Sequence, residues 1–154
     1  DEDSKEVETS RTEIIQDIVS DILGQIPRQY DIEKVRKAYQ INITPTGVVL
    51  IQELELFNTL IHHMKRHLML IKEAISGDAQ MDEVLEVVVD ALFSGRLPDE
   101  WRRFAPETCK SLGGWMEHLQ KRNQQYKYWS LSGEPLVMWL SGLHVPRSYI
   151  TALI

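Results

Sequence analysis

The side chains best suited to chemistry are three histidines, His62, His63 and His67. His63 and His67 are four residues apart, the spacing at which two imidazoles on one helical face can share a metal ion. The glutamate of a zinc-protease motif is missing, because Met64 follows His63 directly. Two cations in the same helical turn would also repel a metal ion. We therefore interpret the histidines as a polar edge that faces solvent or an interface, and we predict no metal site.

Three other sequence patterns could indicate a catalytic or phosphate-binding site, but each is weaker evidence than the histidines. Cys109 and His118 could form a nucleophile and base, but no orienting acid is evident, so a small buried apolar cysteine is the better interpretation. The acids at 99–100 are adjacent and would point in different directions on a helix, which favours first-turn acids over a carboxylate pair. The glycines at 113–114 lack the lysine and hydroxyl residue of a phosphate loop. We predict no catalytic and no cofactor-binding residue.

Composition narrows the class of protein. A chain of 154 residues is long enough for one domain with a core, and its net charge of -6 argues against broad nucleic-acid binding. No run of eighteen apolar residues exists, so we expect no membrane span. A single cysteine permits no internal disulfide and fits a reducing compartment. We expect a soluble, intracellular protein.

The segment from Thr46 to Ile75 is the element around which the remaining elements should pack. Pro45 and Thr46 suit the start of a helix, and Gly77 suits its end. Its apolar residues alternate at spacings of four and three, which keeps one stripe on one helical face. The stripe consists of Leu50, Leu54, Phe57, Ile61, Met64, Leu68, Ile71 and Ile75.

Shorter amphipathic segments surround this central helix. We expect a flexible acidic lead-in over 1–9, a capping box at Ser10–Glu13 that opens a helix ending at Pro27, and a short helix capped by Asp31. Further helices are expected over 80–93, around Trp101, over 108–128 and after Pro146, although the β-branched run within 80–93 also suits a strand. Glycines 113–114 would mark close packing or a break. Residues 136–140 suit a buried extended segment.

The predicted fold is therefore all-α, with about six helices around one long central helix and at most a short extended segment near 136–141. Residues 10–154 are expected to form the helical domain. The apolar end at 152–154 has no polar cap, which indicates a chain truncated from a larger protein. For the core we predict Leu54, Phe57, Ile61, Leu68, Trp101 and Trp115.

Aromatic and cationic residues alternate in the second half. Such mixtures are typical of protein interfaces, where aromatic side chains anchor and arginines bridge, and Arg102, Arg103 and Trp139 are our interface candidates. An ordinary aromatic core with a charged exterior fits the same pattern.

Several ordered blocks resemble the tryptophan-rich C-terminal region of dynein heavy chains. In the second half these are Pro98, Trp101-Arg102-Arg103, Ala105-Pro106, Lys110-Ser111-Leu112-Gly113, Trp115-Met116, 137–144, Pro146, Ser148-Tyr149 and Thr151-Ala152-Leu153. On the long helix they are Pro45-Thr46, Val48-Val49-Leu50, Gln52-Glu53 and Phe57-Asn58. The resemblance covers 10–154. Leu56, Phe104 and Cys109 depart from the pattern, and the changes leave the subtype open between cytoplasmic and axonemal, with axonemal favoured.

This resemblance implies a function that the composition does not show. Dynein heavy chains are minus-end-directed microtubule motors built on a ring of AAA+ modules, and their C-terminal region packs on one face of that ring. It implies the AAA+ modules of the same heavy chain as partners, and other dynein subunits and microtubules only through the parent motor. ATP and magnesium would belong to the parent motor, because no ATP-binding residue of the family matches here. The implied location is the cytoplasm and cytoskeleton, including the axoneme of cilia or flagella.

Three functional hypotheses result from the sequence. The first is a non-catalytic helical brace, which packs on the ring and couples its modules. The second is a free-standing helical adaptor that binds a partner helix. The third is a histidine-based metalloenzyme, which would contain stoichiometric zinc.

Overall fold

A long central helix, α3 (Pro45–Ile75), organises the fold. The Thr44 side chain, rather than that of Thr46, caps it by accepting the N–H of Gly47 at 3.0 Å, and Pro45 occupies its first turn. Gly77 follows the last turn with a φ of 82°, the left-handed conformation that glycine adopts without strain. The predicted central helix is thus confirmed. Its apolar stripe from Leu50 to Ile71 is buried.

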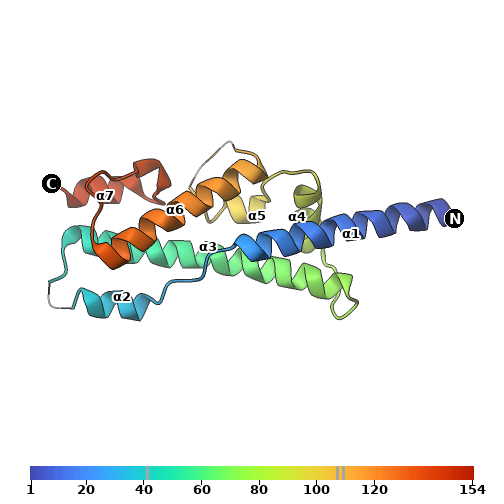
Figure 1. Ribbon diagram of the computed structural model, residues 1–154, viewed down its shortest axis with the longest axis horizontal. Coiled ribbons are helices and arrows are strands. Elements are labelled where there is room, and N and C mark those ends of the chain that lie inside the picture. The colour runs from blue at the N-terminus through green and yellow to red at the C-terminus, as the bar shows by residue number, and fades with distance from the viewer. Residues whose placement is uncertain (41, 107, 109) are drawn as a thin grey trace.

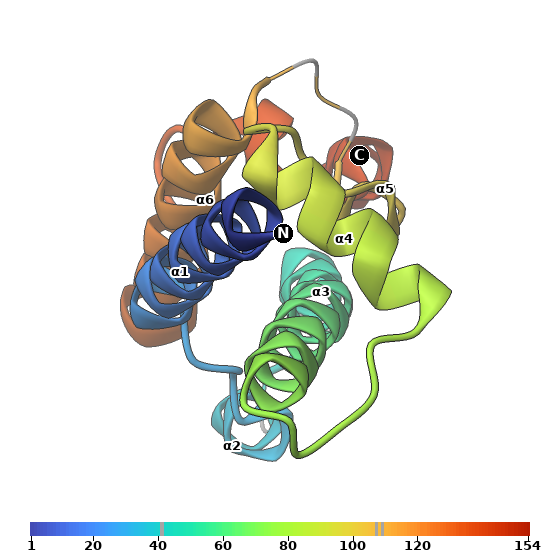
Figure 2. The ribbon, with the colours of Figure 1, turned by 90° about the vertical axis from the view of Figure 1, so that its right-hand side faces the viewer.

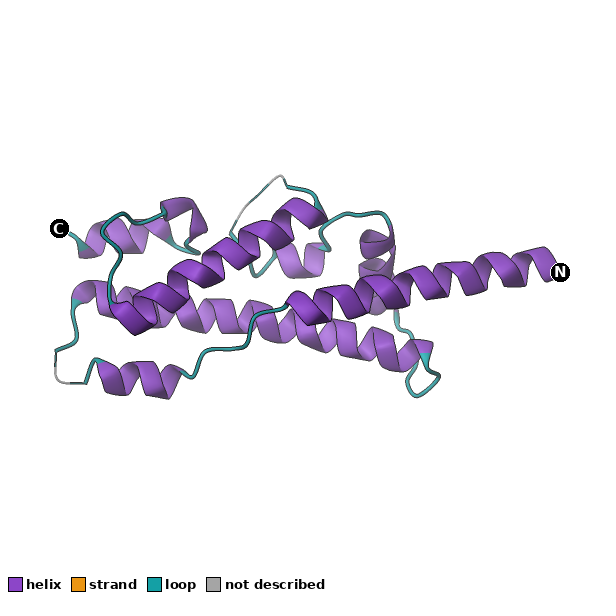
Figure 3. Cartoon of the chain, in the orientation of Figure 1, coloured by secondary structure: helices purple, strands orange, loops and turns teal. Residues whose placement is uncertain are grey.

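The computed structural model describes residues 1–40, 42–106, 108 and 110–154. These residues form helices and no strand (Figure 3), which confirms the all-α prediction. Beside α3, the structure contains α1 (Glu2–Gln25), α2 (Ile32–Ala38), α4 (Glu83–Phe93), α5 (Asp99–Arg102), α6 (Leu112–Ser132), the short 3-10 helix η1 (Leu140–Gly142) and α7 (Pro146–Ala152). None of the described helices is long and apolar enough to cross a membrane.

The other helices pack around α3, and contacts join each of the other six α-helices to it. An end-on view shows α3 between α1, α2, α4 and α6 (Figure 2). The β-branched segment in 84–89 is helical, with Asp82 as its N-cap. The six residues predicted for the core are at most 2% exposed: Leu54, Phe57, Ile61, Leu68, Trp101 and Trp115.

The N-terminal prediction was wrong in one respect. Helix α1 begins at Glu2, so Ser10 lies inside the helix and caps nothing. The acids in its first turn interact favourably with the positive end of the helix dipole. The hydroxyls of Thr9 and Thr12 donate to carbonyls one turn earlier. The first buried side chain is Ile15, and Figure 1 shows the earlier turns extending past the other helices. That 1–9 is flexible stays a prediction.

Two predictions in the second half were also wrong. Helix α6 begins at Leu112, so Gly113 and Gly114 lie in its first turn, where a Cβ added at Gly113 would meet nothing within 4 Å. The pair therefore marks neither close packing nor a break. The segment at 136–140 is not buried, because Leu136 and Val137 are 104% and 87% exposed on the loop that follows α6.

Candidate functional site

The three histidines do not converge on one point. His67 accepts a hydrogen bond at Nδ1 from the indole N–H of Trp101, at 3.1 Å, and burial lowers its pKa. The His63 ring stacks on Phe104 with centroids 4.1 Å apart, and His62 is exposed. Across 1–40, 42–106, 108 and 110–154, no three side chains of metal-binding type are grouped to hold an ion.

The other candidate chemical groups have structural partners where the structure describes them. The acids at 99–100 form exposed i, i+3 ion pairs with Arg102 and Arg103 at 3.9 and 3.3 Å. His118 lies edge-on to the ring of Trp139, 4.9 Å between centroids, and Cys109 lies outside the described residues. Arg102 and Arg103 are exposed and Trp139 is half-buried. Their role as interface residues stays a prediction.

A buried carboxylate, that of Glu53 on α3, is the centre of the most densely connected polar site. Glu53 is 1% exposed and accepts three hydrogen bonds. The Tyr126 hydroxyl and the His144 backbone N–H donate to Oε2 at 2.8 and 2.7 Å, and the Val145 N–H donates to Oε1 at 2.8 Å. These two amides directly precede α7, and the side chain of its N-cap residue, Val145, accepts no hydrogen bond. The Glu53 carboxylate therefore acts as a cap supplied by α3.

Arg122 on α6 adds the positive charge of this site, and its side chain is 1% exposed. Its Nε donates to the Gly142 carbonyl at 2.9 Å, and its Nη2 lies 2.6 Å from His144 Nε2. The guanidinium also lies over the Phe57 ring, 5.4 Å from its centroid. Nη1 is buried and has no hydrogen-bond partner among the described residues. Together Glu53 and Arg122 attach the 140–145 segment to both long helices.

Burial determines the protonation state of the site. It lowers the pKa of His144 to about 3, and the nearby Arg122 guanidinium acts in the same direction. His144 is thus neutral at pH 7 and accepts from Arg122. Burial also raises the pKa of the Tyr126 phenol, so that it donates to Glu53 as a neutral hydroxyl. A neutral donor and a neutral acceptor beside the Glu53 carboxyl group and the Arg122 guanidinium make a site suited to holding helices in place.

Sequence reasoning did not identify this site, although its signal was present. Glu53 follows Leu50 by three residues and precedes Phe57 by four, so an acid stands within the apolar face of α3. Arg122 stands likewise between Leu119 and Tyr126 on α6. A charge inside an apolar stripe predicts a buried polar partner. The sequence does not show which residue is the hydrogen-bonding partner of Glu53 or of Arg122.

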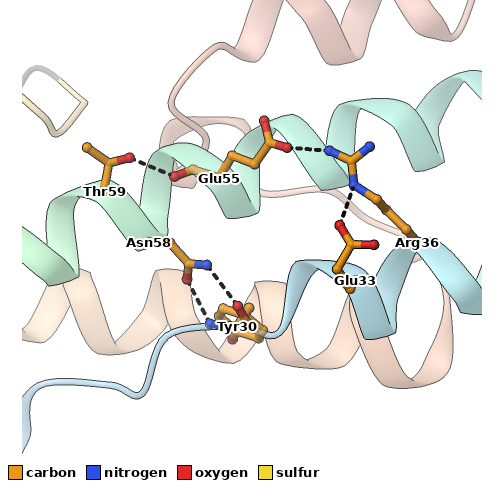
Figure 4. Close-up of polar contacts among 6 residues, drawn as sticks. All are labelled: Tyr30, Glu33, Arg36, Glu55, Asn58 and Thr59. Atoms are coloured by element: carbon orange, nitrogen blue, oxygen red, sulfur yellow. Dashed lines mark hydrogen bonds and ion pairs between the residues drawn. The ribbon is translucent and has the colours of Figure 1, made fainter.

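A second polar contact fixes the connection between α1 and α2 (Figure 4). The Asn58 side chain accepts the N–H of Tyr30 at 2.7 Å and donates to its carbonyl at 2.8 Å. The Tyr30 hydroxyl donates to Asn123 Oδ1 at 2.6 Å, and burial raises its pKa to about 12. Arg36 of α2 pairs with Glu55 of α3 at 2.6 Å on the exposed side. The connection is thereby held against α3 and α6.

Comparisons with known proteins agree with the resemblance. A family model described as the C-terminal domain of dynein heavy chains matches residues 1–154. The chain is 44% identical to human dynein axonemal heavy chain 10 over 94% of its length, and 41% identical over 94% to the dynein-1-alpha heavy chain of the flagellar inner arm I1 complex of Chlamydomonas reinhardtii. It is 33% identical to mouse dynein axonemal heavy chain 12 over 92%.

The chain spans 3–5% of the length of these relatives, so the comparison covers one small region of each. In this chain, the matched residues include all the helices described above and both Glu53 and Arg122. The match extends over the whole described fold. The protein therefore belongs to the family formed by the C-terminal domains of dynein heavy chains.

Proposed function

We propose that this chain is a non-catalytic helical brace of an axonemal dynein heavy chain, which packs on the AAA+ ring of that heavy chain and couples movements of its modules. The observation that carries the proposal is α3, a helix of 31 residues in contact with every other α-helix described. Helices packed on one long axis shift as a unit, because a close-packed core resists continuous deformation. Such a body can transmit a displacement from one module to another.

The surface supports a contact with a larger partner. Val7, Ile14 and Phe93 are 70%, 44% and 44% exposed and line one apolar depression on α1 and α4. Arg11 borders it, with its guanidinium 5.3 Å from the Phe93 ring centroid. Apolar side chains rimmed by a cation are typical of interaction sites. We assign this face to the ring, with Arg102, Arg103 and Trp139 as further candidates.

The relatives support the axonemal assignment and a place in the cytoskeleton of a cilium or flagellum, because their names are those of axonemal and flagellar dyneins. ATP hydrolysis, magnesium binding and microtubule contact would then be carried out by other parts of the parent motor. Within this chain we assign residues to packing and contact alone.

The experiment removes this region from a dynein heavy chain and adds it back as a separate polypeptide. Complex formation and the ATPase rate of the ring are measured for the wild type and for Phe93→Glu, a change at an exposed position. Binding that alters the rate and that Phe93→Glu weakens supports the brace. A folded polypeptide that does not bind would contradict it and favour the adaptor hypothesis.

A further inference from the structure

A groove of about 600 Å³ lies between α2 and the C-terminal half of α6. Both helices pack on α3, and the groove follows the space between them. Its apolar lining comes from Tyr30, Val35 and Ala38 on one side and from Leu131 on the other. Leu131 is 74% exposed, although it lies in a helix that is otherwise anchored to the core. The groove therefore offers apolar surface to a ligand.

The rim of the groove is positive in a protein whose net charge is -6. Arg28, Lys34 and Lys127 line it and are exposed. None of the three forms an ion pair with another described residue, whereas Arg36 nearby pairs with Glu55. The one acid of the lining, Asp31, already caps α2 by accepting the Lys34 N–H at 3.1 Å. The groove thus presents cations that attract negative charge.

The backbone around the groove restricts the conformation of a ligand. Two of its walls are helices, whose main-chain groups bond within each helix. In the connection at 28–31, which completes the lining, both main-chain groups of Tyr30 already bond the Asn58 side chain. The described residues contain no sheet edge that could pair with an extended peptide. A ligand segment must therefore satisfy its own backbone hydrogen bonds. An α-helix with an aliphatic face and flanking acids meets that need and matches both the lining and the rim.

We infer that this groove binds an acidic amphipathic helix of a partner protein. A second copy of this chain could offer two acidic segments: the stretch over 1–13 has a single aliphatic side chain, Val7, whereas α4 exposes Val84 and Val87 beside its acids. Because α4 is already packed on α1 and α3, we commit to a partner protein and let the test below report self-association. Nucleic acid and anionic membranes need a broad basic surface, which the net charge of -6 argues against. The inference is independent of the ring contact, since the groove is lined by α2 and α6 and the depression assigned to the ring by α1 and α4.

The test uses two fluorescein-labelled peptides, one with leucine at every third or fourth position and glutamate elsewhere, the other with lysine replacing glutamate. Fluorescence anisotropy measures their binding to the wild type and to Lys34→Glu/Lys127→Glu. The matched control is Lys72→Glu/Arg96→Glu, which makes the same charge change at exposed positions outside the groove. Circular dichroism checks that all three proteins are equally helical.

We expect the glutamate peptide to bind at least about ten-fold more tightly than the lysine peptide, and more weakly as salt rises. The groove variant should lose at least about ten-fold in affinity, and the control less than about two-fold. Equal binding of both peptides, or equal loss in both variants, would overturn the inference. So would self-association that requires the groove cations, or binding of phosphatidylserine vesicles without binding of the peptide.

Discussion

Replacing Glu53 with alanine should separate the C-terminal segment from α3. The change removes the acceptor of three hydrogen bonds, with donors 2.7–2.8 Å away. A buried donor left without an acceptor costs about 1–3 kcal/mol, and more where the lost partner was charged. Because the three contributions overlap and the site can partly relax, we expect Glu53→Ala to lower the free energy of unfolding by about 3–5 kcal/mol.

Urea unfolding at pH 7 measures the global loss, and amide hydrogen exchange locates it. The backbone amides of His144 and Val145 should exchange faster first, followed by those of α7, since they lose their acceptor. Glu55→Ala is the matched control. Its carboxylate pairs with Arg36 at a half-exposed position of the same helix, so its loss should cost about 0–1 kcal/mol.

Glu53→Gln removes the charge of the side chain at position 53 and keeps its shape. The amide retains one oxygen, but its NH2 group must face either the Val145 N–H or the His144 N–H and Tyr126 hydroxyl, donors that now lack an acceptor. We expect Glu53→Gln to lower the free energy of unfolding by more than half as much as Glu53→Ala does. If Glu53→Ala costs less than about 1 kcal/mol and the protection of the 144–145 amides does not change, the capping role assigned to Glu53 is refuted.

Three further predictions concern a core phenylalanine, the buried histidine and two glycines. Phe57→Ala should lower the free energy of unfolding by about 3–5 kcal/mol, because its fully buried ring packs in the core, and an unchanged thermal or urea melt would contradict this. His144 has a folded pKa of about 3 against an ordinary 6.5, so its contribution to stability is complete above pH 6.5 and is lost as pH falls toward 3. Between pH 7.5 and 4.5 the wild type should lose about 2–3 kcal/mol more than His144→Gln in urea melts, and equal losses would refute a neutral buried imidazole. Gly142→Ala would place its Cβ 2.6 Å from Trp139 Cε3 and should lower the free energy of unfolding by about 1–3 kcal/mol. Gly113→Ala has open space around its Cβ and should raise the free energy of unfolding by about 0.5–1 kcal/mol. Equal melting temperatures of the two variants would contradict the crowding at Gly142.

The long periodic elements could be predicted from the sequence, because their signals are local. The stripe of α3, the stop at Pro27 and the cap at Asp31 depend on residues within a few positions of one another. The start of α1 was missed for a related reason. Ser10 and Glu13 match a capping pattern, yet the acidic residues before them also suit a helix. In the structure the helix begins at Glu2.

The polar site could not be predicted, because its contacts join residues far apart in sequence. Glu53 was visible as an acid on an apolar face, but its donors are Tyr126 and the amides of His144 and Val145. Nothing in the local pattern selects a main-chain amide over any of the exposed cations. The groove between α2 and α6 was hidden likewise, since it depends on how two helices are spaced on a third.

The sequence separation of the Glu53 contacts has a consequence for synthesis. Its three donors follow it by 73, 91 and 92 residues, so the carboxylate has no partner while the intervening helices are being made. Burying it earlier would desolvate a charge without compensation. We therefore expect the Glu53 side chain to stay in contact with water on the ribosome until residue 145 has emerged. Packing around this one carboxylate would then be a late step in the folding of the domain.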